Sequence, residues 1–268
     1  MTNMFSLQGK TAIVTGALGL IGKKHCEALS GAGANVVVAD RDEQSVKLFA
    51  RQLGPQHSGM AIDVTDKESV VVACESILKQ YHTIDVLVNN AAINDMFENP
   101  AMAKELSAFE NYPLEAFQQS LNVNVTGVFL CSQVFGSVMA GQGSGSIINI
   151  ASTYGMVGPD QRIYQNECGE QTFYKSAAYP VTKGAVINFT RFLAAYWGNK
   201  GVRVNTLSPG GVENGQNEIF IQNYSAKTVL GRMAQANDYQ GALIYLASDA
   251  SAYMTGANLV VDGGWTAI

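Results

Sequence analysis

The chain has 268 residues, 47% hydrophobic and 15% charged, so it can bury one large core and is expected to form a single domain over residues 1–268. Its formal net charge is −5 and its longest basic cluster is Lys23-Lys24, so we expect no nucleic-acid partner. Four cysteines and three histidines lack metal-ligand spacing, and neither a leader pattern nor a run of membrane-spanning length is seen; we expect no metal, no membrane contact and a cytoplasmic location.

Short β-prone runs alternate with helical stretches along the chain. Several runs are almost entirely apolar, as strands covered by helices on both faces must be, and right-handed crossovers would place those helices on both faces. The pattern predicts an α/β, doubly wound Rossmann fold with a mostly parallel seven-stranded sheet. The expected strands are Thr11–Thr15, Asn35–Asp40, Gly59–Ile62, Ile84–Asn89, Ser146–Ala151, Val202–Ser208 and Asn258–Asp262. Two longer helices are expected at about 114–140 and 178–196.

A glycine-rich turn follows the first expected strand. Gly16, Gly19 and Gly22 are spaced three residues apart, just ahead of an amphipathic helix. In such a turn, Gly16 allows the tight bend, Gly19 lets a pyrophosphate approach the backbone, and Gly22 permits close packing of helix on strand. The helix N-terminus offers free amides to phosphates. We therefore predict a dinucleotide site that also includes Leu20 and Ile21.

Asp40 closes the second expected strand, where an acid can accept hydrogen bonds from the adenosine ribose hydroxyls. A 2′-phosphate would place negative charge beside this carboxylate, so we expect NAD and regard NADP as less favoured. Arg41 is the one residue that argues for NADP. Asp63, with Val64 beside it after the third strand, is expected to touch adenine.

Three segments interrupt the strand and helix alternation: 94–113, 156–176 and 211–230. Each follows the carboxyl end of an expected strand, where open α/β sheets bind ligands. We therefore expect these insertions to form the substrate walls.

Tyr179 stands four residues before Lys183, and Ser152 ends an apolar run upstream. On a helix this spacing places the ammonium one turn from the tyrosine ring, where it can stabilise a phenolate. Tyr196 and Lys200 share the spacing, so the spacing alone does not identify a site. The serine hydroxyl and the dinucleotide site are what distinguish the first pair.

A series of short motifs follows in order along the chain. They are the glycine turn, Asp63-Val64, Asn89-Asn90-Ala91-Ala92, Val123-Asn124-Val125-Thr126-Gly127, Ser152, Tyr179 with Lys183, Ser208-Pro209-Gly210, Thr255-Gly256 and Asp262-Gly263-Gly264. With these motifs the chain resembles the short-chain dehydrogenases/reductases from about Leu7 to Gly264.

The resemblance implies an active-site tetrad of Asn124, Ser152, Tyr179 and Lys183. In it, Ser152 would hold the substrate oxygen, Tyr179 would exchange a proton with it, and Lys183 would lower the tyrosine pKa and hold the nicotinamide ribose. Asn124 would position a water in the proton relay. The resemblance also implies a homotetramer or homodimer, in which the two long helices pack in pairs.

Further cofactor contacts are implied by the same resemblance. They fall on Asn90, Ala91, Ala92, Pro209, Gly210, Val212 and Asn214. Asn214 stands where the family usually has a threonine that bonds the carboxamide, and Leu20 stands where its single-domain branch usually has glycine. The Gly19 and Gly22 spacing instead follows the longer branch that modifies sugar nucleotides.

The interval from Ser152 to Tyr179, 27 residues, is unusually long for the family, as is that from Asn90 to Asn124. These insertions would bring polar and aromatic groups to the substrate. The candidates are Phe97, Phe109, Tyr112, Tyr164, Glu167, Glu170, Phe173 and Tyr174. Such a lining suits a hydroxylated ring, which suggests a sugar, cyclitol or sugar derivative.

The sequence thus favours an NAD-dependent oxidoreductase that interconverts a secondary alcohol and a ketone on such a small molecule, with Tyr179 as general acid/base. A sugar-nucleotide epimerase or dehydratase that retains its NAD is the alternative favoured by the glycine spacing. A non-catalytic nicotinamide-binding regulator is the third reading.

Overall fold

A computed structural model describes residues 3–94 and 100–268 and contains the expected doubly wound sheet. All six strand pairings are parallel, in the order β3-β2-β1-β4-β5-β6-β7. The strands are β1 (Thr11–Thr15), β2 (Asn35–Asp40), β3 (Ser58–Ala61), β4 (Val86–Asn89), β5 (Gly145–Ile150), β6 (Val202–Pro209) and β7 (Asn258–Val261). The predicted fold class is confirmed, and the strand bounds differ from expectation by no more than two residues.

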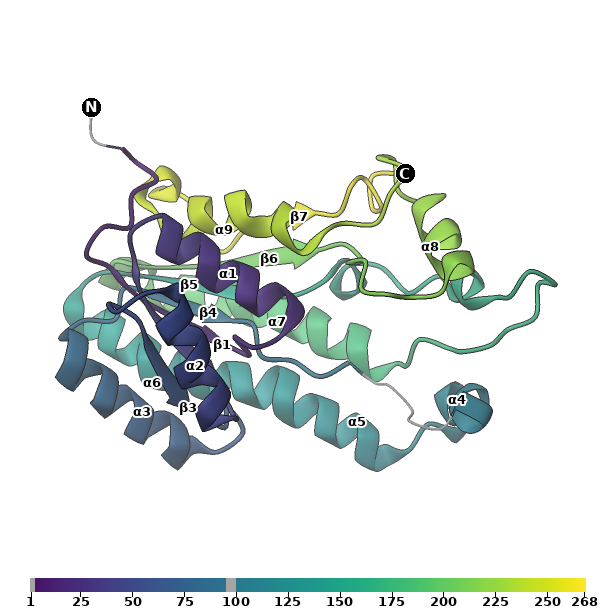
Figure 1. The fold of residues 1–268 in the computed structure, drawn as a ribbon, viewed down its shortest axis with the longest axis horizontal. Coiled ribbons are helices and arrows are strands. Elements are labelled where there is room, and N and C mark those ends of the chain that lie inside the picture. Colours follow the sequence, from purple (N-terminus) through teal and green to yellow (C-terminus); the bar gives the residue numbers. More distant parts are fainter. Residues whose placement is uncertain (1–2, 95–99) are drawn as a thin grey trace.

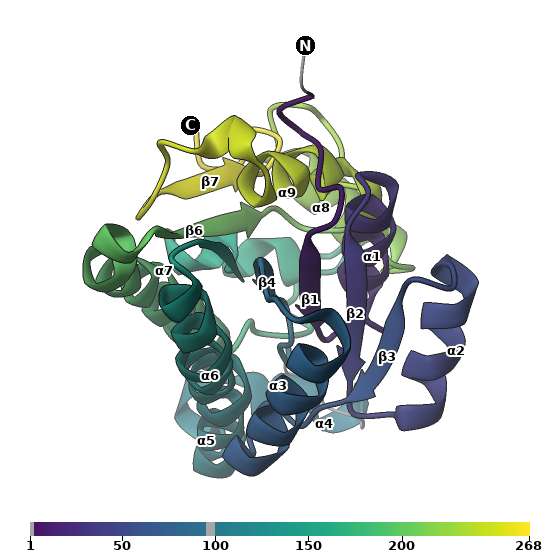
Figure 2. The same ribbon diagram turned by 90° about the vertical axis from the view of Figure 1, so that its left-hand side faces the viewer.

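Helices cover both faces of this sheet, with α1 and α9 on one side and α3, α6 and α7 on the other (Figure 2). The α-helices are α1 (Leu20–Gly31), α2 (Glu43–Leu53), α3 (Lys67–Tyr81), α4 (Pro100–Ser107), α5 (Leu114–Leu121), α6 (Gly127–Gln142), α7 (Ala178–Trp197), α8 (Glu218–Ser225) and α9 (Gln240–Ala247). Two of them begin at aspartates that accept backbone hydrogen bonds as caps, Asp42 for α2 and Asp66 for α3.

The strand side chains divide the core into two layers. In β2, Val36 and Val38 pack with α1 and α9, whereas Val37 packs with α3, α6 and α7. All three valines are 0% exposed. Successive side chains of a strand point to opposite faces, so an apolar run is what a sheet buried on both sides requires.

The first long helix expected from the sequence is one helical stretch over 114–142, interrupted by a π-turn at Asn122–Thr126. Contrary to our expectation, this stretch is long and apolar enough by composition to cross a membrane. Half of its most apolar window is buried inside the protein, however, and Cys131, Phe135 and Met139 belong to the core between α6 and the sheet. It is therefore a core helix.

At the carboxyl ends of the strands, α8 and the C-terminal segment lie together, with α4 at the same end of the molecule (Figure 1). A separate apolar cluster forms there from Tyr154, Ile163, Tyr224, Met233 and Trp265. Tyr179 packs against the cluster from the start of α7. The insertions therefore share a small core of their own with the residue expected to be catalytic.

Candidate active site

A cavity of about 620 Å³ opens at the carboxyl ends of the strands. Six of the seven strands send lining residues into it from their last residue or the turn that follows. These residues are Gly16 after β1, Asp40 at the end of β2, Ile62 after β3, Asn90 after β4, Ser152 after β5 and Gly210 after β6. The cavity lies where open parallel sheets bind ligands.

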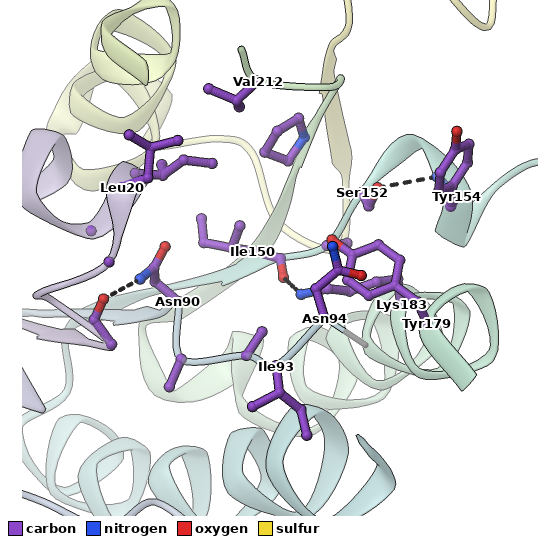
Figure 3. A pocket seen from close by; sticks show the side chains of 18 of the residues that line it. Leu20, Asn90, Ile93, Asn94, Ile150, Ser152, Tyr154, Tyr179, Lys183 and Val212 are labelled. Carbon is purple, nitrogen blue, oxygen red and sulfur yellow. Dashed lines mark hydrogen bonds between the residues drawn. The ribbon is translucent and has the colours of Figure 1, made fainter. Parts of the chain in front are cut away.

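One end of the cavity is a glycine cradle. Gly16 has φ +62°, and a Cβ on it would meet the Ala91 Cα at 2.6 Å. A Cβ on Gly22 would lie 2.2 Å from the Gly16 carbonyl oxygen. The Asn90 side-chain amide donates to the carbonyls of Thr15 and Gly16, both at 2.9 Å, and so ties β4 to the turn (Figure 3).

The start of α1 completes the cradle. Gly19 caps this helix without a side-chain hydrogen bond, so the first amides are left for a ligand. A bare backbone at a helix N-terminus fits a dinucleotide pyrophosphate. Gly19, Leu20 and Ile21 all line the cavity, and their expected contact with a dinucleotide stays a prediction.

Asp40 is fixed against this cradle. Its Oδ2 accepts a hydrogen bond from the Leu18 amide at 3.0 Å, and its Oδ1 accepts one from the Arg41 amide at 2.8 Å. Asp40 and Arg41 both line the cavity. A carboxylate therefore stands at the end of β2, with a guanidinium on the next residue.

Asp63 is placed differently from its neighbours. Val64 lines the cavity and so does Thr65, but Asp63 is not among the described lining residues. Its Oδ1 accepts hydrogen bonds from the Thr65 amide and hydroxyl, at 2.9 and 2.7 Å, and these bonds lower the pKa of Asp63. The Asp63 carboxylate therefore stabilises the turn that follows β3, and its expected contact with adenine stays a prediction.

At the other end of the cavity, Tyr179 and Lys183 share one face of the first turns of α7. The Lys183 Nζ lies 5.6 Å from the centroid of the Tyr179 ring and donates to the Ile150 carbonyl at 2.8 Å (Figure 3). Lys183 is 3% exposed, and burial lowers its pKa to about 8. The α7 ammonium is thereby tied to the end of β5.

Ser152 follows β5 and faces the same ring. Its Oγ accepts a hydrogen bond from the Tyr154 amide at 3.2 Å, which fixes the start of a short 3₁₀ turn. Burial raises the pKa of Tyr179, while a hydrogen bond between Tyr179 and Ser152 acts to lower it. A substrate oxygen that replaced this bond would lie between the two hydroxyls.

Asn124 lies behind the cavity, in the π-turn, and is not among the described lining residues. Its side-chain amide accepts from the Ile93 amide at 2.8 Å and donates to the Ile93 carbonyl at 3.0 Å and to the Thr182 hydroxyl at 3.2 Å. It therefore links α7 to the segment after β4. Its side-chain oxygen and nitrogen both have protein partners, and its expected role of positioning a water stays a prediction.

The remaining predicted cofactor contacts are brought together along the cavity wall. They are Asn90, Ala91, Ala92, Pro209, Gly210, Val212 and Asn214. Asn94, Lys175 and Tyr224 line the cavity and belong to the three segments expected to form the substrate walls, although they were not singled out there. Gln119, Tyr154 and Met233 are lining residues that were not anticipated. The position of Tyr154 two residues after Ser152, and of Lys175 four residues before Tyr179, could have marked both as site residues. No such local pattern marks Tyr224.

The segment 211–230 supplies several lining residues, whereas the described part of 156–176 supplies Tyr164 and Lys175. Among the predicted aromatic and acidic candidates that the structure describes, only Tyr164 is a lining residue. Phe109, Glu167 and Glu170 are exposed, and Phe173 packs on Tyr164 with ring centroids 5.4 Å apart. Tyr112 and Tyr174 are partly buried outside the described lining. Phe97 lies outside the described residues.

The chain is similar to known dehydrogenases over nearly its full length. The sequence profile of the family described as "Enoyl-(Acyl carrier protein) reductase" matches residues 16–266. D-threitol dehydrogenase of Mycolicibacterium smegmatis is 36% identical over 98% of this chain and 95% of its own length. Galactitol 2-dehydrogenase (L-tagatose-forming) of Cereibacter sphaeroides is 33% identical over 98% and 97%.

Among solved structures, the gluconate 5-dehydrogenase of Burkholderia cenocepacia in complex with NADP and tartrate aligns with a TM-score of 0.86 and 31% identity. The alignment covers 99% of this chain and 98% of that one.

Proposed function

The chain belongs to the short-chain dehydrogenase/reductase family, and on that premise we propose that it oxidises a secondary alcohol of a polyol, sugar or cyclitol with NAD, with Tyr179 as the proton acceptor. It is an NAD(P)-dependent dehydrogenase that acts on CH–OH groups. The observation that supports the proposed chemistry best is the meeting of Ser152, Tyr179 and Lys183 at one end of the cavity, opposite the glycine cradle.

The bound nicotinamide supplies the hydride acceptor for this oxidation. Ser152 donates a hydrogen bond to the substrate oxygen and orients the alcohol. The Tyr179 oxygen takes the hydroxyl proton, and the Lys183 ammonium favours the phenolate that this requires. In the reverse direction, Tyr179 returns the proton to the carbonyl oxygen.

The proton then leaves through the interior. In our proposal the Lys183 ammonium gives a proton to a water held by the main chain at the π-turn around Asn124, and the proton from Tyr179 replaces it. The Asn124 side chain supports this path indirectly, because it holds the Ile93 segment and Thr182 of α7 in register.

The proposed substrate class is supported by the substrates of the relatives and by the tyrosines that line the cavity. The named relatives act on threitol, galactitol and gluconate, which are small polyhydroxylated molecules. Tyr164 and Tyr224 line the same end of the cavity as Tyr179, and burial raises the pKa of each to about 12. Their hydroxyls stay protonated at neutral pH and can exchange hydrogen bonds with substrate hydroxyls.

NAD preference is also part of the proposal. Two similar solved structures contain NADP, so the proposed preference for NAD rests on this chain's own residues. Asp40 lines the cavity, and its carboxylate would bind the adenosine ribose hydroxyls and repel a 2′-phosphate. The glycine turn carries Ala17 and Leu18 rather than a basic residue.

A screen over sugars, polyols and cyclitols with NAD and with NADP tests this function, read as cofactor reduction. We expect released NADH with members of this panel. Turnover confined to steroids or acyl thioesters would contradict the substrate class. An epimerase or dehydratase with retained NAD would convert a sugar nucleotide without releasing NADH, and a regulator would bind NAD without turnover.

We further propose a homotetramer or homodimer in the cytoplasm. Apolar side chains stay exposed on α6 and α7: Phe129 (45%), Phe192 (60%), Tyr196 (59%) and Val181 (49%). Phe192 and Tyr196 stack with ring centroids 5.8 Å apart. Pairing of these helices between copies would cover this face, and sedimentation equilibrium of the wild type beside Phe192→Glu tests the assembly.

A further inference from the structure

We propose that Tyr224 is the residue that selects the substrate, and that its hydroxyl donates a hydrogen bond to a second substrate hydroxyl, on the carbon next to the one that is oxidised. The preferred substrates are then vicinal diols, and the products are hydroxyketones. This inference rests on the proposed oxidation of a secondary alcohol and narrows it. The observations concern how the Tyr224 ring is held, which bond its hydroxyl makes, and where it stands relative to Tyr179.

The Tyr224 ring is fixed by its packing. Tyr224 lies in α8, is 4% exposed, and stacks on Trp265 with ring centroids 4.2 Å apart and an interplanar angle of 21°. Phe220, one turn earlier in α8, lies 6.0 Å from the same ring. The two elements that supply these rings, α8 and the C-terminal segment, lie together at the carboxyl ends of the strands (Figure 1). The fold therefore sets the direction of the Tyr224 hydroxyl.

The oxygen of this hydroxyl is bonded to the loop that follows β6. It accepts a hydrogen bond from the Gly211 amide. A Cβ on Gly211 would lie 2.5 Å from the Tyr224 Cζ and 2.8 Å from its hydroxyl oxygen, so this close approach requires glycine. Gly211 and Tyr224 both line the cavity. The hydroxyl end of the ring therefore stands at the cavity wall.

The hydrogen of the Tyr224 hydroxyl is left for a ligand. Among the residues that the structure describes, none accepts a hydrogen bond from it. Burial raises the pKa of Tyr224 to about 12, so the hydrogen is present at neutral pH. A hydroxyl that already accepts a hydrogen bond is a stronger donor, because the two bonds polarise each other. A buried donor without an acceptor costs free energy, and a substrate oxygen at this point would remove that cost.

The acceptor must lie close to the oxygen that reacts. Tyr179 packs against the apolar cluster to which Tyr224 and Trp265 belong. Tyr179 also acts electrostatically on Tyr224 and raises its pKa, so the two phenols are near each other. When Ser152 and Tyr179 hold the reacting oxygen, the nearest other substituents of the substrate are those on the neighbouring carbon. A hydroxyl there can accept the hydrogen bond of Tyr224.

Tyr239 supports the same loop without reaching the cavity. Its hydroxyl donates to the Gly210 carbonyl at 3.1 Å. Tyr239 is 0% exposed, packs in the core layer of α1 and α9, and is not among the described lining residues. Two tyrosines are thus bonded to consecutive residues of one loop, and of these two Tyr224 is the one that lines the cavity. This difference provides a matched control.

Two pairs of alcohols test the inference: cyclohexane-1,2-diol with cyclohexanol, and butane-2,3-diol with butan-2-ol, each in all stereoisomers. The members of a pair differ only in the hydroxyl on the neighbouring carbon. We expect kcat/KM of the wild type to be at least about 10-fold higher for the diol, because the mono-alcohol leaves the Tyr224 donor unpaired. Tyr224→Phe keeps the stacked ring and should lower this ratio by about 10-fold.

Tyr239→Phe separates recognition of the substrate from support of the loop. Both variants remove one hydrogen bond to the loop, so both should lower the melting temperature and the NAD affinity measured by calorimetry. Loss of loop support acts on diol and mono-alcohol alike. We therefore expect the diol-to-alcohol ratio to fall in Tyr224→Phe and to stay at the wild-type value in Tyr239→Phe.

A wild type that oxidises polyols but shows equal kcat/KM within the pairs, or oxidises neither diol, overturns the inference even if Tyr224→Phe does not fold. So does an unchanged ratio in Tyr224→Phe, or an equal change in both variants, which would mean that Tyr224 only supports the loop. These outcomes leave the proposed function intact. A wild type that oxidises no sugar, polyol, cyclitol or diol overturns both.

Discussion

The ammonium of Lys183 lies 5.6 Å from the centroid of the Tyr179 ring, one helical turn along α7. Tyr196 of the same helix repeats this relationship at 5.9 Å with Lys200, which lies in the 3₁₀ turn that follows α7. The surroundings of the two lysines differ: Lys183 is 3% exposed, whereas Lys200 lies on the surface beside Tyr196, which is 59% exposed. Burial beside a serine hydroxyl and a dinucleotide cradle, rather than spacing, is what makes the first pair a candidate for proton transfer.

Replacing Lys183 by Met should move the acid limb of the pH profile. Alcohol oxidation needs Tyr179 as phenolate, so kcat/KM rises with pH as the tyrosine ionises. Loss of a neighbouring cation raises the tyrosine pKa, and we expect the acid limb to shift upward by about one unit or more. Lys183→Arg should shift it less, and Lys200→Met should leave it in place. An unmoved limb in Lys183→Met would show that this ammonium does not tune Tyr179.

Asp40→Ala should change the preference between the two dinucleotides. The variant loses hydrogen bonds to the ribose and the repulsion of a 2′-phosphate, so the NADP-to-NAD ratio of kcat/KM should rise by about 10- to 100-fold. Asp42→Ala removes a carboxylate two residues away that caps α2, and should cost about 1 kcal/mol of stability without changing this ratio. Equal ratios in the Asp40 variant and the wild type would refute our reading of Asp40.

Gly22→Ala should damage the cradle, because its Cβ would lie 2.2 Å from the Gly16 carbonyl oxygen. We expect NAD affinity measured by calorimetry to fall by at least about 10-fold, together with a lower melting temperature. Gly31→Ala in the same helix meets open space and should be neutral or stabilising by up to about 1 kcal/mol. Unimpaired NAD binding by Gly22→Ala would place the cofactor elsewhere.

His25 should make the protein sensitive to acid. It is fully buried in α1, neither ring nitrogen has a hydrogen-bond partner in the described part of the chain, and burial lowers its pKa from 6.5 to about 4. Below pH 6.5 the unfolded chain binds a proton that the folded chain does not. The stability present above pH 6.5 is therefore lost as pH falls towards 4, by about 3 kcal/mol.

His25→Leu should flatten this acid limb in urea unfolding between pH 4 and 7. His57 leaves a residual slope of the same sign, because burial also lowers its pKa and its Nδ1 accepts from the Val36 amide. His82→Asn is the matched control, since His82 is exposed at the left-handed end of α3 and asparagine tolerates that conformation. A His25→Leu profile as steep as the wild type would contradict this assignment.

The parts predictable from sequence were those with a local signature. Val36-Val37-Val38 signals a strand buried on both faces, the glycine spacing signals the cradle, and the order of motifs places Ser152 with Tyr179. The π-turn around Asn124 was missed because a one-residue bulge leaves the helical pattern of the segment almost unchanged.

The substrate wall was less predictable, because its contacts join distant residues. Tyr224 stacks on Trp265 at 4.2 Å, and no local pattern links them. Lys175 enters the cavity because Gln161 clamps its backbone across the insertion. The acids expected there, Glu167 and Glu170, are exposed on that insertion, because a carboxylate that stays in water avoids the free-energy cost of desolvation.

The most direct test of the account is NADH formation by Tyr179→Phe and Tyr196→Phe over the panel of sugars, polyols and cyclitols, with NAD affinity measured in parallel. We expect Tyr196→Phe to match the wild type. Tyr179→Phe should lose at least about 1,000-fold in kcat while binding NAD with nearly unchanged affinity. Wild-type turnover by Tyr179→Phe would contradict the account, because the proton would then be accepted by another group.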